Sequence, residues 1–192
     1  MELLLASGSP RRAELLRQIG VPFRVLKAPD IDETPQPGEA PLAYVRRMAR
    51  EKAAAGATGQ SDQAVMGADT AVVLGEQILG KPRDDAHALA MLTALSGREH
   101  QVISAVCIHC AAGENVQQSL TRVHFRALDK ATLQAYVATG EGRDKAGAYG
   151  IQGLGGALVA TLNGSYSGVV GLPLEQTVTL LDWAGIPYWQ RL

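Results

Sequence analysis

The stretch 64-AVMGADTAVVL-74 is the most apolar run in the chain. A nearly continuous apolar run is typical of a strand that is buried on both faces of a sheet. We therefore expect residues 64–74 to form a central strand. Asp69 interrupts the run, and a buried carboxylate is costly unless it is paired with a cation or coordinates a metal.

Asp69 has a structural and a functional interpretation. As a structural residue it would cap a loop or close a buried ion pair. As a functional residue it would lie just inside a strand that leads to Lys81, in the region of open α/β sheets where functional groups gather. This position favours the functional interpretation.

Strands and helices alternate on both sides of residues 64–74. Apolar periodicity and turn residues predict strands at 3–5, 21–25, 101–110, 120–126 and 157–162, and helices at 10–20, 41–55, 84–95, 129–139 and 172–185. This order, with one inserted hairpin, predicts an α/β fold with a mixed sheet flanked by helices. The sequence contains no internal repeat or linker, so we expect residues 1–192 to form a single domain.

The composition excludes several classes of protein. Of the 192 residues, 46% are hydrophobic and 19% are charged, as in ordinary globular proteins. The net charge of −1 argues against a protein that coats nucleic acid, but not against a small phosphorylated ligand. No apolar stretch suits a membrane span or a signal peptide, so we expect a cytoplasmic protein.

The two cysteines, Cys107 and Cys110, fall three residues apart in the predicted strand 101–110. Residues at this spacing point to opposite faces of a strand and cannot chelate one ion together. We expect two ordinary buried thiols.

The turn before the first helix indicates an anion site. Ser7 and Ser9 offer hydroxyl groups, Gly8 allows close backbone approach, and Arg11 and Arg12 occupy the first helical turn. A helix N-terminus favours acidic residues in this turn, so two arginines suggest a bound anion such as phosphate. The alternative is a pair of solvated arginines, each unfavourable by only about 0.3–1 kcal/mol.

Lys52 adds a second cation. It shares one face of the predicted helix 41–55 with Val45 and Ala49, so it lies on the apolar stripe. A lysine in this position either extends out to solvent, which is the commoner case, or reaches a buried phosphate.

Two further segments carry candidate groups. Asp32 and Glu33 lie in a Pro-rich acidic loop, which is either merely solvated or, beside a phosphate site, a source of magnesium ligands. The glycine-rich segment 140–156 lacks the pattern of a Walker loop. We interpret it as a loop of close approach from which Lys145 and Gln152 project.

These residues lie within blocks that together resemble the Maf family of nucleotide pyrophosphatases. The blocks follow the family order and cover nearly the whole chain: residues 7–12, 30–33, 51–53, 67–70, 80–82, 144–153 and 170–174. The resemblance implies an α/β sheet in two lobes around a central cleft, related to ITPase-like house-cleaning enzymes. It also implies a homodimer.

The resemblance assigns roles residue by residue. Asp69 is the expected proton acceptor, Glu33 and Asp69 match the family's metal site, and the metal is expected to be magnesium, manganese or cobalt. Arg12, Lys52 and Lys81 match the family's phosphate-binding positions, and Ser7 and Lys145, proposed from the turn and the glycine-rich segment, are expected to bind phosphate with them. Those expected to set specificity are Arg11, Thr70 and Gln152, where the subgroup acting on 7-methyl-GTP has Trp, Gln and Glu.

The resemblance implies a reaction as well. Metal-bound water is expected to attack the α-phosphorus of dTTP or UTP, and of modified pyrimidine triphosphates, and to release pyrophosphate. The sequence departs from the family at Ser104-Ala105, where Thr-Gly is common; the change keeps a hydroxyl, and we expect it to affect packing only. Two alternatives remain: a hydrolase that releases orthophosphate, and a regulator of septum formation that binds nucleotide without turnover and acts in cell-division arrest.

Overall fold

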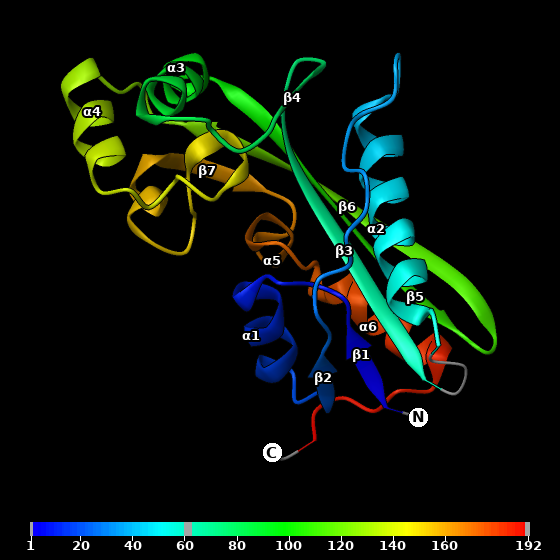
Figure 1. Ribbon diagram of the computed structural model, residues 1–192. Coiled ribbons are helices and arrows are strands. Elements are labelled where there is room, and N and C mark those ends of the chain that lie inside the picture. The colour runs from blue at the N-terminus through cyan, green and yellow to red at the C-terminus, as the bar shows by residue number, and fades with distance from the viewer. Residues whose placement is uncertain (1, 60–62, 191–192) are drawn as a thin grey trace.

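The computed structural model describes residues 2–59 and 63–190. A seven-stranded mixed sheet runs through it in the order β2-β1-β3-β5-β6-β7, and β4 pairs with β3 (Figure 1). The strands are β1 (Leu3–Leu5), β2 (Phe23–Val25), β3 (Ala64–Leu74), β4 (Gln77–Leu79), β5 (Glu99–Cys110), β6 (Gly113–Phe125) and β7 (Val159–Asn163). The helices are α1 (Pro10–Gln18), α2 (Pro41–Ala57), α3 (Asp85–Leu95), α4 (Lys130–Ala138), α5 (Tyr166–Val170) and α6 (Leu174–Ala184), with short 3-10 turns η1 (Ala146–Ala148) and η2 (Leu154–Leu158).

The predicted central strand is confirmed. β3 pairs in parallel with β1 on one side and antiparallel with β5 on the other, and most of its residues are buried. Burial on both faces explains why the sequence here is apolar throughout instead of alternating.

Helices cover both faces of the sheet. α2 lies along one face, where its apolar side packs with Cys107 and other residues of β3 and β5. The opposite face carries a core formed with α1 and α6, which contains Cys110. The two cysteines are therefore buried, unpaired thiols on opposite faces of β5, as expected from their spacing.

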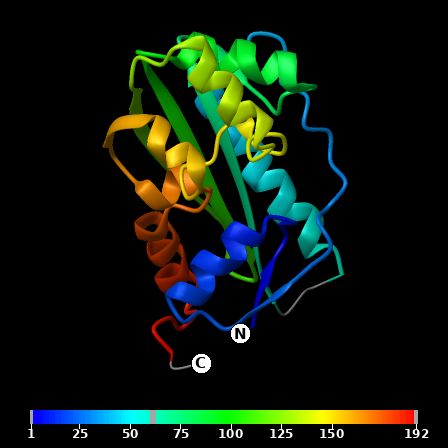
Figure 2. The same cartoon turned by 90° about the vertical axis from the view of Figure 1, so that its left-hand side faces the viewer.

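The face opposite α2 is covered in two separate parts. One core lies at the end near α1 and α6, and the other lies at the far end, under α3, α4 and η1. Figure 2 shows these two groups of helices at opposite ends of the sheet. The predicted mixed sheet with flanking helices is therefore confirmed, and Ile151 packs against both cores.

Two element predictions were wrong. β6 begins at Gly113 and not at residue 120, because its polar first half pairs with the second half of β5, from Ser104 to Cys110. Tertiary pairing overrides weak strand propensity here. The helix α5 was missed because it is short and contains Gly168, and glycine is a poor helix former. Packing favours glycine there, since a Cβ would come within 2.6 Å of Ser119 Oγ.

The edge of β3 that faces β1 is paired only at its two ends. β1 pairs with β3 through Met66, and β4 pairs with it from Val72 onward. Among the described residues, no strand pairs with residues 67–71 on this side. The gap contains Asp69 and Thr70. Within the same described part of the chain, no helix is long and apolar enough to cross a membrane.

Candidate active site

A cavity of about 880 Å³ lies beside the open edge of β3. Polar and charged residues reach it from the turn after β1, the acidic loop, α2, β3, the segment after β4 and the glycine-rich segment. Those proposed from the sequence are Ser7, Ser9, Arg11, Arg12, Glu33, Lys52, Asp69, Thr70, Lys81, Lys145 and Gln152. The cavity therefore gathers every residue that the family resemblance assigned to the site.

Asp69 and Lys52 form a buried ion pair at the cavity wall. Lys52 Nζ lies 2.7 Å from Asp69 Oδ1, and the two side chains are 12% and 10% exposed. Lys52 Nζ also lies 3.1 Å from Glu33 Oε1. Burial raises the pKa of Asp69 above its ordinary value, and the charge and hydrogen bond of Lys52 oppose this shift. Asp69 therefore has the features of both the structural and the functional interpretation, since it is ion-paired and also lines the cavity.

Gly67 allows this pair to form. A Cβ at Gly67 would come within 2.3 Å of the Ala49 carbonyl oxygen and 2.4 Å of the Ala53 nitrogen. α2 therefore crosses β3 in direct backbone contact, two residues before Asp69. Because side chains alternate along a strand, Gly67 and Asp69 share the face that α2 covers.

Thr70 points to the opposite face of β3. Its hydroxyl lies 2.7 Å from Ser104 Oγ, which in turn donates to the Gly168 carbonyl oxygen at 2.6 Å. Ser104, where the sequence departs from the family, thus contributes a hydrogen bond between β5 and α5. Because serine keeps the hydroxyl of the family's threonine, the departure leaves the group that makes this hydrogen bond in place.

The two arginines of the first helical turn differ in environment. Arg12 donates from Nε to the Gly171 carbonyl oxygen at 2.8 Å, from Nη1 to Ser7 Oγ at 3.1 Å and from Nη2 to Thr70 Oγ1 at 3.5 Å. Burial lowers the pKa of Arg12, although Asp69 opposes this, and a guanidinium remains charged in proteins. Arg12 therefore links three segments around the cavity by direct hydrogen bonds.

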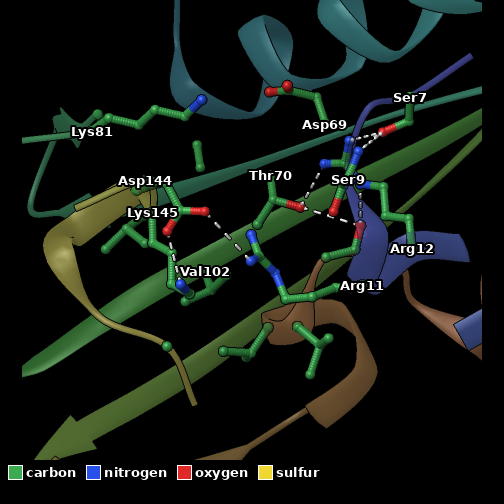
Figure 3. A pocket seen from close by; sticks show the side chains of 18 of the residues that line it. Ser7, Ser9, Arg11, Arg12, Asp69, Thr70, Lys81, Val102, Asp144 and Lys145 are labelled. Atoms are coloured by element: carbon green, nitrogen blue, oxygen red, sulfur yellow. Dashed lines mark hydrogen bonds and ion pairs between the residues drawn. The ribbon is translucent and has the colours of Figure 1, made fainter. Parts of the chain in front are cut away.

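Arg11 extends into the cavity instead. Its Nη1 lies 4.0 Å from Asp144 Oδ2, and Figure 3 shows its guanidinium facing Asp144 and Lys145. Ser9 occupies the N-cap position of α1, but its side chain makes no capping hydrogen bond, so its hydroxyl is not used to end the helix.

Two further lysines, Lys81 and Lys145, line the cavity. Lys81 lies on the same side as Asp69 in Figure 3 and is exposed. Lys145 donates from Nζ to the Glu141 carbonyl oxygen at 2.6 Å and lies 2.8 Å from Asp144 Oδ1. The charge of Lys145 is therefore already shared with Asp144, which sequence reasoning did not foresee.

The acidic loop contributes Glu33 but not Asp32. Asp32 does not line the cavity, and its Oδ1 accepts a hydrogen bond from the Thr34 nitrogen at 2.9 Å. Asp32 forms a local turn because its short side chain reaches its own backbone two residues on. The structure therefore brings Glu33, but not Asp32, to the cavity.

Tyr44 and Arg47 hold this loop, and sequence reasoning missed both. Tyr44 donates its hydroxyl to the Glu33 carbonyl oxygen at 2.9 Å, and Arg47 donates to the Thr34 carbonyl oxygen at 3.1 Å and to Glu39. Arg47 lowers the pKa of Glu39 to about 2. The spacing of three residues on one helix was a usable signal, because it places Tyr44 and Arg47 on one face.

The donor set fits a divalent metal such as magnesium. Glu33 and Asp69 already converge on one cation, the ammonium group of Lys52. Among the described residues, no group of three or more His, Cys, Asp or Glu side chains could hold a metal alone. Magnesium is commonly bound by one or two carboxylates together with water and substrate phosphates. The pair therefore suits a metal that shares its ligands with a bound nucleotide.

The fold and the cavity define an α/β protein with a cleft lined by charged residues of both signs and a buried carboxylate at its wall. The chain belongs to the Maf-like protein family, whose model matches residues 2–184.

Two curated relatives are similar to this chain over nearly its whole length. The dTTP/UTP pyrophosphatase of Alcanivorax borkumensis is 70% identical over 191 residues, which cover 99% of each chain. The dTTP/UTP pyrophosphatase of Myxococcus xanthus is 54% identical, with coverage of 96% of this chain and 93% of the relative. A crystal structure of a nucleoside-triphosphatase, dITP/XTP pyrophosphatase, from Mycobacterium abscessus aligns over 96% of this chain and 95% of that one, with a TM-score of 0.48 and 18% identity.

Proposed function

We propose that this protein hydrolyses dTTP and UTP, and modified pyrimidine triphosphates, to the monophosphate and pyrophosphate. The observation that carries the proposal is the buried Asp69 carboxylate at the wall of a cavity lined by Arg11, Lys52, Lys81 and Lys145. A relative 70% identical over nearly the whole chain bears the name of this activity.

Asp69 is the proton acceptor in this proposal. A water oxygen forms a bond to the α-phosphorus as the bond from that phosphorus to the bridging oxygen of the β-phosphate breaks. Asp69 takes the proton of the attacking water, and pyrophosphate leaves with the electron pair of the broken bond. Burial keeps the pKa of Asp69 above its ordinary value, which makes it a better base at neutral pH.

The lysines and Arg11 stabilise the departing pyrophosphate. Lys52 holds Asp69 in place by its 2.7 Å contact and keeps a positive charge beside the reacting phosphate. Preorganised cations in a partly closed cavity stabilise developing negative charge more than they would in water. A divalent metal held by Glu33 and Asp69 would add positive charge against the phosphate oxygens.

The products distinguish this proposal from its alternatives. With UTP or dTTP and magnesium, we expect the monophosphate and pyrophosphate to appear in equal amounts, and activity to disappear after chelation. Chromatography of the nucleotide products and separate assays for pyrophosphate and orthophosphate provide the measurement. Orthophosphate as first product would contradict the bond assignment, and tight binding without turnover would favour the regulator.

Base recognition is assigned to Gln152, which is exposed at the cavity rim. Its amide can donate to a uracil or thymine carbonyl oxygen and accept from the ring N3–H. The flipped amide suits cytosine, so backbone groups of the glycine-rich segment must add to the preference for uracil.

Gln152→Glu should lower kcat/KM for UTP by the equivalent of about 1–3 kcal/mol, the cost of an unmade hydrogen bond. Ionised glutamate only accepts hydrogen bonds, so it faces a uracil carbonyl with negative charge but suits the N–H groups of guanine. The loss measured with a guanine nucleotide should therefore be smaller. Gln134→Glu, an exposed change on α4, is the matched control. Equal losses for both bases would mean that Gln152 does not read the base.

Homodimer assembly and roles in house-cleaning or cell-division arrest stay predictions from the family resemblance, and a cytoplasmic location stays a prediction from the sequence.

A further inference from the structure

Glu141 lies near the start of the glycine-rich segment, three residues after the end of α4, and its carboxylate is the centre of a hydrogen-bond network. It accepts hydrogen bonds from the Leu154 nitrogen at 2.8 Å, the Gly155 nitrogen at 2.8 Å and the Tyr136 hydroxyl at 2.7 Å. The Tyr136 hydroxyl in turn accepts from the Gly150 nitrogen at 3.1 Å. None of these contacts involves Asp69 or Lys52, where the chemical step is proposed to occur.

The network holds the chain on both sides of Gln152. Gly150 precedes Gln152 by two residues and is tied to Glu141 through Tyr136, whereas Leu154 follows by two residues and is tied directly. The Gln152 side chain itself is exposed at the cavity, so its direction depends on the backbone that carries it.

The glycines of this segment match the position of the carboxylate. A Cβ at Gly153 would lie 1.8 Å from Glu141 Oε1, and a Cβ at Gly155 would lie 2.5 Å from the Gly150 carbonyl oxygen and 2.7 Å from the Tyr136 hydroxyl. Only glycine lets the backbone close around Glu141 at both places.

We propose that Glu141 is a positioning residue that sets nucleotide affinity and base discrimination by fixing the backbone on both sides of Gln152. It acts through Gln152 and leaves the chemical step to Asp69. This inference rests on the proposed function of the site, in which Gln152 contacts the base. Tyr136 extends the same control to Gly150.

Charge is essential to this role. Burial alone would raise the pKa of Glu141, but hydrogen bonds from Tyr136 and from the Gly155 and Leu154 nitrogens lower it below its ordinary value. The group is therefore an ionised acceptor with both oxygens in use. Glutamine keeps the shape but replaces one oxygen with an NH₂ donor, which must then face an N–H or O–H donor of the network.

Glu141→Gln tests the proposal, with Tyr136→Phe as a milder second variant. Both should weaken binding of UTP, the first by about tenfold or more because it disrupts hydrogen bonds to a charged group. kcat should stay within about threefold, since Asp69 and Lys52 are untouched. The preference for UTP over CTP and GTP should shrink in both variants. Glu99→Gln, an exposed change on β5, should alter none of these quantities.

Two measurements make the outcome decisive. Calorimetric titration with UTP, dTTP, CTP and GTP gives Kd values even for a protein that does not turn over, and steady-state kinetics gives KM and kcat. Hydrogen–deuterium exchange of a peptide covering residues 149–158 should be faster in Glu141→Gln than in the wild type. The last readout depends on no nucleotide.

Failure of the inference and failure of the proposed function look different. A wild-type protein that neither binds nor cleaves pyrimidine triphosphates would contradict the proposed function, and this inference with it. A wild type that prefers UTP, with variants of unchanged Kd and discrimination, would overturn the inference alone. So would a variant that loses kcat at unchanged KM, or one whose segment 149–158 exchanges at the wild-type rate.

Discussion

Replacing Asp69 with asparagine should lower kcat for UTP by about 10²–10⁴-fold, the range typical of a lost general base. Asparagine keeps the size of the side chain and an oxygen that can accept from Lys52, but it cannot take a proton from water. Lys52 also keeps Glu33 as a partner at 3.1 Å, so the fold should persist. Steady-state kinetics of pyrophosphate release measures the effect, and circular dichroism confirms that the variant is folded.

Asp182→Asn, an exposed change on α6, serves as the matched control and should leave kcat unchanged. A folded Asp69→Asn protein with near-normal kcat would show that Asp69 is only the structural partner of Lys52. The proton would then have to pass to another group.

Replacing Lys52 with methionine should have the largest effect on stability, lowering the free energy of unfolding by about 3–5 kcal/mol. The substitution leaves the carboxylate of Asp69, whose side chain is 10% exposed, without its nearest cation. Urea unfolding in metal-free buffer gives the free energy. Lys130→Met, an exposed change at the start of α4, should cost far less.

A second substitution tests the cause of this loss. Adding Asp69→Asn to Lys52→Met removes the unpaired charge, so the double variant should be more stable than Lys52→Met alone. If the two changes destabilise additively, the loss does not arise from the stranded charge of Asp69.

The sequence predicted the fold wherever local signals agreed with burial. The apolar run 64–74 became β3 with the expected bounds, and Pro10, Pro41 and Gly97 mark helix boundaries as their backbone preferences require. Prediction failed where tertiary contacts decide the structure. The first half of β6 is polar and forms a strand only because β5 lies beside it.

The contacts of the candidate site likewise fall into those that the sequence could predict and those that it could not. A carboxylate in an apolar strand and a lysine on an apolar stripe both need a partner, and each supplies the other. By contrast, nothing local announces that Arg12 binds Gly171 or that Glu141 accepts from residues 154 and 155. These contacts join segments distant along the chain or folded back on themselves, so only the assembled fold reveals them.

The open edge of β3 also bears on aggregation. An unpaired strand edge is a template on which another chain can add a strand, and an apolar edge is the most dangerous kind. Here the unpaired residues 67–71 lie between β1 and β4, which occupy both ends of the edge, and the opening forms a cavity lined by charged side chains. A foreign strand would have to displace β1 or β4 to pair there, whereas a small molecule needs neither to move. The protein can thus leave the middle of its most apolar strand accessible to a ligand while denying it to other polypeptides.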